Sequence, residues 1–309
     1  MEYRELGQTG LNVSALSFGA SSLGNVFRKV NEADGLRTVH TCIDLGINLI
    51  DVSPYYGLTL AETVLGKALK TIPRDKYYLA TKVGRYGDNS FDFSAARVTA
   101  SVDESLRRLN VEYVDIIQCH DIEFGDLNQV VNETIPALRR LQETGKVRFV
   151  GITGLPLKAF EVVAEQTAVD TILSYCRYSL NDTALADKLP YFQQKGIGVI
   201  SASPLSMGLL TNRGAPDWHP APTAVRAACA HAAAHCRAHG ADIAQLALQF
   251  SLAHPGITTT MVGTADPGNM VKNIKWADNP PDSELLADVQ AILAPIHNQT
   301  WLSGRPENN

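Results

Sequence analysis

The segment INLIDVSPYYG, residues 47–57, contains a short apolar run that ends at a carboxylate, Asp51, and is followed by two tyrosines and Gly57. Such a run is expected of a buried strand. A strand that leads into a polar turn would explain the pattern. An active site at the end of a strand would also explain it, and the other apolar runs of the chain bear on the choice.

Similar apolar runs recur along the whole sequence and alternate with helical patterns. They lack strict apolar/polar alternation, which suits parallel strands covered on both faces. Helical periodicity predicts helices over 32–46, 94–110 and 128–145, with Ser94 as an N-cap and Gly145 as a terminator. The expected strands are residues 15–19, 48–52, 77–82, 113–120, 148–152, 171–175, 198–202 and 259–263.

This alternation of strands and helices, repeated about eight times, predicts an α/β fold, a (β/α)8 TIM barrel. The segment GQTG (7–10) predicts a small β-hairpin at the N-terminus. We expect one domain over residues 1–309, because no low-complexity tract or Ser/Gly linker divides the chain. The alternative, an open doubly wound sheet, would carry GxGxxG after its first strand. The sequence there is FGASSLGNV (18–26), without that fingerprint.

The bulk composition is that of an ordinary globular protein, with 309 residues, 45% hydrophobic and 19% charged, and a net charge of −5. This charge gives no electrostatic case for nucleic acid or an anionic membrane as a partner. No apolar run reaches the roughly 18 residues of a membrane helix, and the polar start is not a signal peptide. Five scattered cysteines without a CxxC motif predict free thiols. We therefore expect a cytoplasmic protein.

Four chemically active side chains fall at or just beyond the ends of three consecutive expected strands. Asp51 ends the second strand and Tyr56 follows it, while Lys82 ends the third strand and His120 the fourth. In a (β/α)8 barrel these positions share the mouth at the C-terminal ends of the strands, where the chemistry takes place. Each residue alone has a structural explanation, as a turn cap, a packing residue, a solvated lysine or a buried histidine. The four together favour a catalytic site.

The segments DVSPYYG (51–57), ATKVG (80–84) and IIQCHD (116–121) resemble the signature segments of the aldo-keto reductase family, and the resemblance covers essentially the whole chain. It implies a catalytic tetrad of Asp51, Tyr56, Lys82 and His120. It also implies that Tyr56, directly before the glycine, is the acid/base, whereas Tyr55 shapes the pocket. Hydride transfer then belongs to a nicotinamide that the protein positions, and no metal is needed.

The expected roles of the tetrad follow from elementary acid–base chemistry. A phenol has an ordinary pKa of about 10, which is too high for a base near neutrality. Lys82 would stabilise the phenolate of Tyr56 and lower its pKa. Asp51 would keep Lys82 charged and oriented. His120 would hydrogen-bond the reacting oxygen or assist proton transfer.

The resemblance places the cofactor along the later strand ends. The segment SASPLSMGLL (201–210) is similar to the family's pyrophosphate loop. Where the family usually has Ser–Asn and glutamine around the carboxamide, this chain has Thr153, Gly154 and Tyr175, and Ala202 stands where many members have a stacking tyrosine. The expected cofactor contacts are Gly19, Ala20, Asp51, Thr153, Tyr175, Ser203, Leu205, Gly208, Gly263, Thr264, Asn269 and Asn273.

The adenosine end decides which cofactor is expected. NADP-dependent relatives carry Lys and Arg there, and the matching positions of this chain are Gly263 and Asn269, with Asp266 adding a negative charge. A dianionic phosphate without a cationic partner would bind poorly, whereas a ribose hydroxyl suits Thr264 or Asn269. We therefore expect NAD in preference to NADP, and an enzyme that works as a dehydrogenase.

Longer segments, among them SPYYGLTLAETVLGKAL (53–69) and GKVRFVGITGLPL (145–157), are similar to the plant branch of the family that oxidises C1 of L-galactose to L-galactono-1,4-lactone in ascorbate biosynthesis. The next nearest branch oxidises L-fucose and D-arabinose in sugar catabolism. The resemblance thus implies a small sugar, L-galactose or a related aldose, as substrate. The candidate sugar contacts are Tyr55, Tyr56, His120, Asp121, Glu123 and Arg177, with Trp218 or Trp301 as a lid.

Two other functions stay open. One is an NADP-linked carbonyl reductase of broad specificity, which the adenosine-end residues disfavour. The other is a non-catalytic, nicotinamide-binding regulatory subunit, since some relatives serve ion channels as β subunits; the intact tetrad weakens this alternative. The segment 213–228 could cover the site or meet a partner, and the sequence does not set the oligomeric state.

Overall fold

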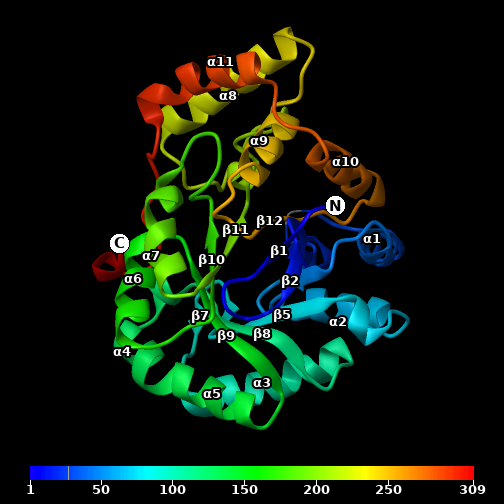
Figure 1. Cartoon of the computed structure of the whole chain (residues 1–309), viewed down its shortest axis with the longest axis vertical. Coiled ribbons are helices and arrows are strands. Elements are labelled where there is room, and N and C mark those ends of the chain that lie inside the picture. The colour runs from blue at the N-terminus through cyan, green and yellow to red at the C-terminus, as the bar shows by residue number, and fades with distance from the viewer. Residues whose placement is uncertain (27) are drawn as a thin grey trace.

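The computed structural model describes residues 1–26 and 28–309. Eight parallel strands close a barrel in the order β10-β11-β12-β3-β4-β5-β8-β9, with helices packed around it (Figure 1). The predicted (β/α)8 fold is confirmed, and each expected strand is present. The barrel strands are β3 (Leu16–Gly19), β4 (Leu49–Asp51), β5 (Tyr78–Val83), β8 (Val114–Cys119), β9 (Val147–Gly154), β10 (Thr171–Tyr175), β11 (Gly198–Ala202) and β12 (Thr259–Val262).

The predicted N-terminal hairpin is confirmed as well. Strand β1 (Tyr3–Glu5) pairs antiparallel with β2 (Asn12–Ser14). Leu6, Leu11 and Val13 from this hairpin join the apolar cluster that fills the barrel, which includes Leu49 and Ile116. The hairpin therefore closes the barrel at the N-terminal ends of its strands and leaves the opposite end free for a site.

The helical predictions hold with one correction. Ser94 caps α3, because its Oγ accepts from the Arg97 N–H at 3.4 Å, and the expected helix at 32–46 is α1. The helix expected over 128–145 is present, but a π-helical turn, Val130–Thr134, interrupts its α-helical hydrogen bonding between α4 and α5. Pro136 follows this turn and lacks the N–H that a regular helix would use. The helices are α1 (Glu32–Asp44), α2 (Leu60–Leu69), α3 (Ala95–Leu109), α4 (Leu127–Gln129), α5 (Ile135–Glu143), α6 (Leu157–Gln166), α7 (Leu189–Gln194), α8 (Thr223–Ala238), α9 (Ile243–Leu252), α10 (Pro267–Ala277) and α11 (Ser283–Leu293).

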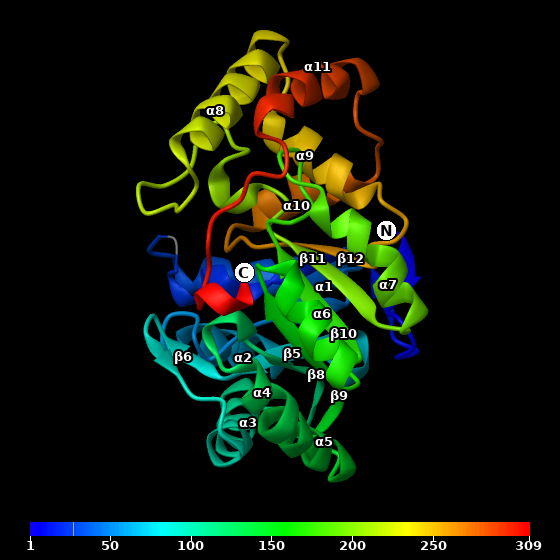
Figure 2. The ribbon, with the colours of Figure 1, turned by 90° about the vertical axis from the view of Figure 1, so that its left-hand side faces the viewer.

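Outside the barrel, α8 and α11 pack side by side and form a second apolar cluster with α9 (Figures 1 and 2). The segment 213–228 contributes an irregular loop and then the first turns of α8. In that loop His219 Nε2 donates to the Ser206 carbonyl at 3.1 Å, while the Trp301 ring lies 5.0 Å from the His219 ring. The loop thus packs against the segment expected to bind pyrophosphate.

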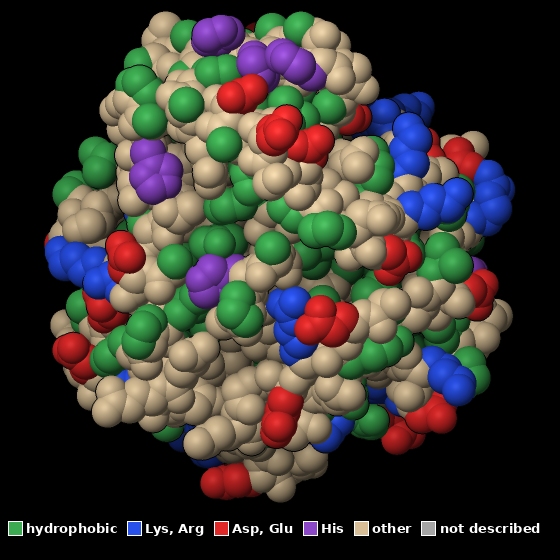
Figure 3. All heavy atoms as spheres, turned by 45° about the horizontal axis from the view of Figure 1, so that its top comes forward, with side chains coloured by type: hydrophobic (Ala, Val, Ile, Leu, Met, Phe, Trp, Pro, Cys, Tyr) green, Lys and Arg blue, Asp and Glu red, His purple; other side chains and the backbone are tan. Residues whose placement is uncertain are grey.

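The five cysteines, Cys42, Cys119, Cys176, Cys229 and Cys236, are buried and unpaired, so the free thiols expected from the sequence are confirmed. Burial raises the pKa of Cys119 to about 12, which makes it an unreactive thiol. No helix of the described residues has the length and apolarity to cross a bilayer. On the face drawn in Figure 3, Lys and Arg side chains are interspersed with Asp and Glu, which gives no support for a nucleic-acid partner.

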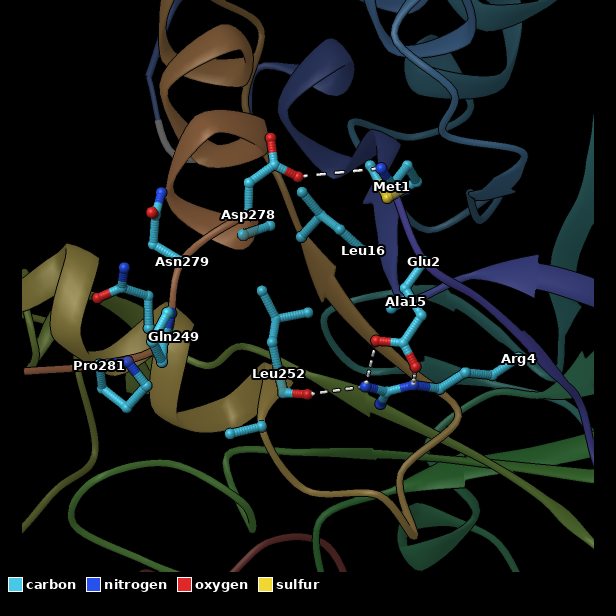
Figure 4. Close-up of a pocket in the computed structure, with 13 residues that line it drawn as sticks. Met1, Glu2, Arg4, Ala15, Leu16, Gln249, Leu252, Asp278, Asn279 and Pro281 are labelled. Atoms are coloured by element: carbon cyan, nitrogen blue, oxygen red, sulfur yellow. Dashed lines mark hydrogen bonds and ion pairs between the residues drawn. The ribbon is translucent and has the colours of Figure 1, made fainter.

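A pocket of about 320 Å³ lies beneath the barrel, between the hairpin, the start of β3 and the helices α9 and α10 (Figure 4). Arg4 crosses beside it and donates to the Leu252 carbonyl at 3.1 Å and the Ile257 carbonyl at 2.8 Å. Glu2 pairs with the same guanidinium at 2.8 Å. Arg4 therefore ties the hairpin to the segment that leads into β12, at the end of the barrel that serves stability.

Replacing Arg4 with alanine should lower the stability of the protein without changing its site. Three backbone carbonyls lose their donor, which costs about 1–3 kcal/mol and lowers Tm by roughly 2–5 °C for a chain of this size. Thermal unfolding measures the effect. The matched control is Arg37→Ala, which breaks an exposed ion pair with Asp34 on α1 and should leave Tm nearly unchanged. Equal Tm values for the two variants would contradict this role.

Candidate active site

A close approach of two backbone segments positions Tyr56. Gly57 has φ +62°, and a Cβ there would stand 2.1 Å from the Gly24 carbonyl oxygen. Only glycine meets both demands, which explains why a glycine directly follows the tyrosine. The Tyr56 ring lies 4.9 Å from Lys82 Nζ and meets the His120 ring edge-on at 5.6 Å. The residues expected from three different strand ends are therefore brought together.

Lys82 on β5 and Asp51 on β4 form a fully buried ion pair below Tyr56. Lys82 Nζ also donates to the Val52 carbonyl at 2.8 Å, and Asp51 Oδ2 accepts from Gln118 Nε2 at 2.7 Å. Burial by itself would lower the pKa of Lys82, but the charge of Asp51 and the Tyr56 phenol outweigh it and raise the pKa above its ordinary value. The ammonium therefore stays charged, as the predicted tetrad requires.

His120 is a neutral imidazole in this site. Burial, with some help from the Lys82 charge, lowers its pKa to about 3. Its Nδ1 lies 2.9 Å from Ser53 Oγ, which already accepts the Tyr55 N–H at 3.1 Å. We assign the single hydroxyl proton of Ser53 to a hydrogen bond with Nδ1, which leaves the ring proton on Nε2. His120 can then donate a hydrogen bond to a reacting oxygen.

The acidity of Tyr56 differs from the sequence-based expectation. Lys82 does act to lower the pKa of Tyr56, as expected. Burial raises the pKa and outweighs the effect of Lys82, and the charge of Asp51 raises it further. The net result is a pKa of about 12 for Tyr56. Tyr56 is therefore a protonated phenol in the ligand-free site at neutral pH.

The residues expected to contact a sugar fall into two groups. Tyr55 and Asp121 lie beside the tetrad and share Arg85, which stacks over the Tyr55 ring at 3.9 Å and pairs with Asp121 at 2.5 Å. Glu123 and Arg177 are engaged within the protein. Glu123 is fully buried, and Arg177 Nη1 lies 2.8 Å from Asp182. That these four contact a sugar stays a prediction.

The loop expected to hold a pyrophosphate has an unusual backbone. Ser203, Ser206, Met207 and Gly208 all have positive φ, from +47° to +104°. Internal hydrogen bonds hold the loop, with the Ser206 N–H donating to the Ser203 carbonyl at 2.8 Å and the Gly208 N–H to the Leu205 carbonyl at 3.0 Å. The backbone strain persists only because the surrounding structure holds it. That this loop contacts a pyrophosphate stays a prediction.

The expected adenosine end is lined by small and hydroxyl-bearing residues. A Cβ on Gly263 would stand 3.1 Å from the Gly19 carbonyl and 3.4 Å from Ser21 Oγ, so glycine leaves a small polar cradle between β12 and β3. Asp266 caps α10 by accepting the Asn269 N–H at 3.1 Å. These groups fit ribose hydroxyls.

The other expected cofactor residues lie around the same mouth. Thr153 Oγ1 accepts the Asp121 N–H at 2.9 Å, and the Tyr175 hydroxyl lies 3.4 Å from Glu123 Oε1. Gly19 and Ala20 follow one another where β3 ends, Thr264 comes just after β12, and Asn269 and Asn273 lie one turn apart on α10. Their contact with a cofactor stays a prediction.

Sequence reasoning missed three residues that support the site. Ser53 fixes the imidazole of His120, Gln118 holds Asp51, and Arg85 joins Tyr55 to Asp121. Ser53 and Gln118 stand inside the signature segments, and Gln118 is a polar residue within an apolar strand, which was an available signal. Arg85 lies in the short β6 (Arg85–Gly87), which pairs with β7 (Ser90–Phe91) in a hairpin that the sequence analysis did not foresee.

Comparison with known proteins agrees with this fold. The family model described as "Aldo/keto reductase family" matches residues 15–294. L-galactose dehydrogenase of Arabidopsis thaliana is 52% identical over 100% of this chain and 99% of its own length. D-threo-aldose 1-dehydrogenase of a Pseudomonas species is 29% identical over 87% of this chain and 90% of its own length.

Among solved structures, an aldo-keto reductase from Bacillus halodurans in its holo form superimposes with a TM-score of 0.78 at 27% identity, covering 97% of this chain and 98% of that one. The family match spans most of the sequence, and the closed barrel agrees with it. The chain belongs to the aldo/keto reductase family and is an oxidoreductase.

Proposed function

We propose that the protein is an NAD-dependent aldose 1-dehydrogenase that oxidises L-galactose at C1 to L-galactono-1,4-lactone. One observation carries the proposal: a charged Lys82 and a neutral His120 flank Tyr56 in a chain that is 52% identical to an L-galactose dehydrogenase over its full length. The free, buried cysteines suit a reducing compartment, and we place the enzyme in the cytoplasm. In a plant-type pathway this step would serve ascorbate biosynthesis.

The proposed mechanism gives each tetrad residue one task. The phenolate form of Tyr56 takes the proton of the anomeric hydroxyl while His120 Nε2–H donates a hydrogen bond to the same oxygen. Lys82 stabilises the phenolate of Tyr56 before it takes this proton, and Asp51 keeps the ammonium in place. A bound nicotinamide supplies the acceptor for the hydride that leaves C1. Asp121 and Tyr55, at the rim, are placed to bind the sugar's other hydroxyls.

The preference for NAD rests on the adenosine end. Gly263, Thr264 and Asn269 offer small or uncharged groups, and Asp266 adds a carboxylate that would repel a 2′-phosphate. A non-catalytic regulatory subunit would not need the complete buried ion pair below Tyr56, because that pair is costly to desolvate.

Replacing Tyr56 with phenylalanine should remove the proton acceptor and leave the pocket intact. We expect kcat to fall by roughly 10²–10⁴-fold, the usual contribution of general acid–base catalysis. The affinity for NAD, measured by the quenching of protein fluorescence, should stay at the wild-type level. The control is Tyr191→Phe on α7, which removes a hydroxyl remote from the mouth. Near-normal turnover of the Tyr56 variant would reject the assignment.

The pH dependence should follow the raised pKa of Tyr56. Because burial raises this pKa to about 12, the phenolate is scarce at pH 7 and becomes commoner as pH rises. The kcat for sugar oxidation should therefore increase between pH 7 and pH 10, whereas reduction, which needs the phenol, should not increase. Initial rates in both directions measure this. An oxidation rate that falls as pH rises over this range would contradict it.

The cofactor and substrate assignments can be tested together. Purified protein with L-galactose should form NADH, with a kcat/KM for NAD well above that for NADP. Asn269→Arg adds a cation at the exposed start of α10 and should raise kcat/KM for NADP by roughly tenfold, because a charge-assisted hydrogen bond contributes about 1.5–3 kcal/mol. Turnover of L-fucose or D-arabinose alone would keep the mechanism and change the substrate. Equal use of both cofactors by the wild type would reject NAD preference.

A further inference from the structure

The last residues of the chain form a compact turn against the loop that follows β8. The segment runs from α11 across the molecule and ends beside α6 (Figure 2). We call residues 303–309 the C-terminal clamp and residues 121–125 the β8 loop. The Asn309 side chain donates to the carbonyls of Ser303 and Arg305 at 2.9 and 2.8 Å. Lys158 of α6 donates to the carbonyls of Glu307 and Asn309 at 3.0 and 3.1 Å, which gives the clamp a fixed shape.

The clamp grips the backbone of the β8 loop. The Glu123 carbonyl accepts the Arg305 N–H at 2.9 Å and Asn308 Nδ2 at 2.9 Å. The same Asn308 amide donates to the Gly125 carbonyl at 3.1 Å and is buried. Gly304 approaches so closely that a Cβ on it would stand 2.3 Å from the Glu123 carbonyl, and its φ is +74°. The fit is therefore specific and leaves no room for a larger residue.

The Glu123 carboxyl joins the clamp to the mouth of the barrel. Its Oε1 accepts the Ser303 hydroxyl at 2.9 Å and the Leu155 N–H at 3.1 Å, and the Tyr175 hydroxyl lies at 3.4 Å. Its Oε2 is buried without a hydrogen-bond partner. A Cβ on Gly154 would stand only 2.6 Å from this oxygen, so the space around the oxygen is tightly filled.

The charges around Glu123 favour its neutral form. Asp121 on the same loop and Tyr175 on β10 are acidic groups, and the nearby cations Lys158 and Arg305 donate to backbone carbonyls rather than to the carboxyl. Burial, reinforced by the charge of Asp121, raises the pKa of Glu123 to about 8. In its neutral form, the Glu123 carboxyl can accept from Ser303, Leu155 and Tyr175 on Oε1. No unpaired charge is then buried.

The β8 loop needs this support because its first residue is strained. Asp121 has φ +51°, a conformation that a residue with a Cβ adopts only when its surroundings impose it. Thr153 and Arg85 hold Asp121 from one side, and the clamp holds Glu123 two residues further on. His120, directly before Asp121, is fixed separately by its N–H bond to the Val83 carbonyl at 2.8 Å.

We propose that the C-terminal clamp is a positioning element of the active site, latched through Glu123, which holds the β8 loop so that Asp121 can bind the sugar. Its effect on kinetics rests on the proposed aldose dehydrogenase function. Glu123 thereby takes a positioning role, in place of the sugar contact expected from the sequence. Loss of the clamp should weaken sugar binding far more than the chemical step, because the tetrad is fixed by the strands.

The latch has a definite pH dependence. The docked clamp helps to bury the Glu123 carboxyl, and burial, which raises its pKa, outweighs the hydrogen bond from Ser303, which lowers it, so docking is strongest below the ordinary glutamate pKa of about 4.5. It weakens as pH rises through the window up to about 8 and then levels off. Glu123→Gln mimics the neutral acid in shape and should make docking independent of pH. Hydrogen exchange of residues 303–309, corrected for the intrinsic pH effect, measures this without any substrate.

The decisive comparison uses two glycines with positive φ. Gly304→Ala places a methyl group against the Glu123 carbonyl, whereas Gly240→Ala carries similar backbone strain (φ +70°) with nothing within 4 Å. We expect Gly304→Ala to speed exchange in both the clamp and residues 121–125, and to raise KM for the sugar roughly tenfold with kcat within about threefold. NAD affinity should be unchanged. Gly240→Ala should match the wild type in all of these measurements.

Each outcome bears on the proposal. Faster exchange in the clamp without any change in residues 121–125 or in KM would overturn it, as would a pH-independent clamp in the wild type. Asn308→Ala, which removes two donors without adding bulk, serves as the second variant if Gly304→Ala does not fold. A wild-type protein that oxidises no aldose would reject the proposed function, and exchange in residues 121–125 would still decide whether the clamp positions the loop.

Discussion

The buried ion pair between Lys82 and Asp51 is the interaction on which the site depends. Two charges removed from water are stabilised only when their remaining hydrogen-bonding groups find partners. Here the Val52 carbonyl, directly after β4, and the Gln118 amide of β8 supply those partners. Parallel strands at a fixed spacing hold these groups at one depth, so the barrel itself provides the precision. The pair places a fixed positive charge beside Tyr56. The orientation of His120 depends instead on its hydrogen bond with Ser53.

The loops above the strands are held by other means, because they lack a regular hydrogen-bond ladder. Close backbone contacts fix them instead. Gly57 fits against Gly24, and Gly304 fits against the Glu123 carbonyl. Other loop residues, such as Asp121 and Ser206, have a left-handed backbone with positive φ. Strain of this kind is retained where neighbouring segments over-determine the backbone, and here it coincides with the expected cofactor and sugar positions.

The strands and the tetrad could be predicted because their signals are local. Apolar runs of β-branched residues mark the strands, and Asp51, Lys82 and His120 stand at their ends. The π-helical turn before Pro136 was missed because helical periodicity continues through it. Arg85, Gly304 and Asn308 were missed for a different reason. Their partners lie 36 to 185 residues away along the chain, and nothing in a single sequence pairs a tail residue with the carbonyl of a distant loop.

Two buried carboxyls in this barrel show how surroundings decide chemical role. Asp51 meets an ammonium and an amide, so its charge is matched and serves to hold Lys82. Glu123 meets hydroxyls, an N–H and the negative Asp121, with no cation on its carboxyl, so burial favours the protonated acid. Tyr56 stands between these cases, since burial opposes its ionisation while Lys82 promotes it. Burial thus raises the pKa of all three residues, and their partners set them apart: Lys82 and Gln118 counter the effect of burial on Asp51, Lys82 counters it only in part for Tyr56, and no cation counters it at the Glu123 carboxyl.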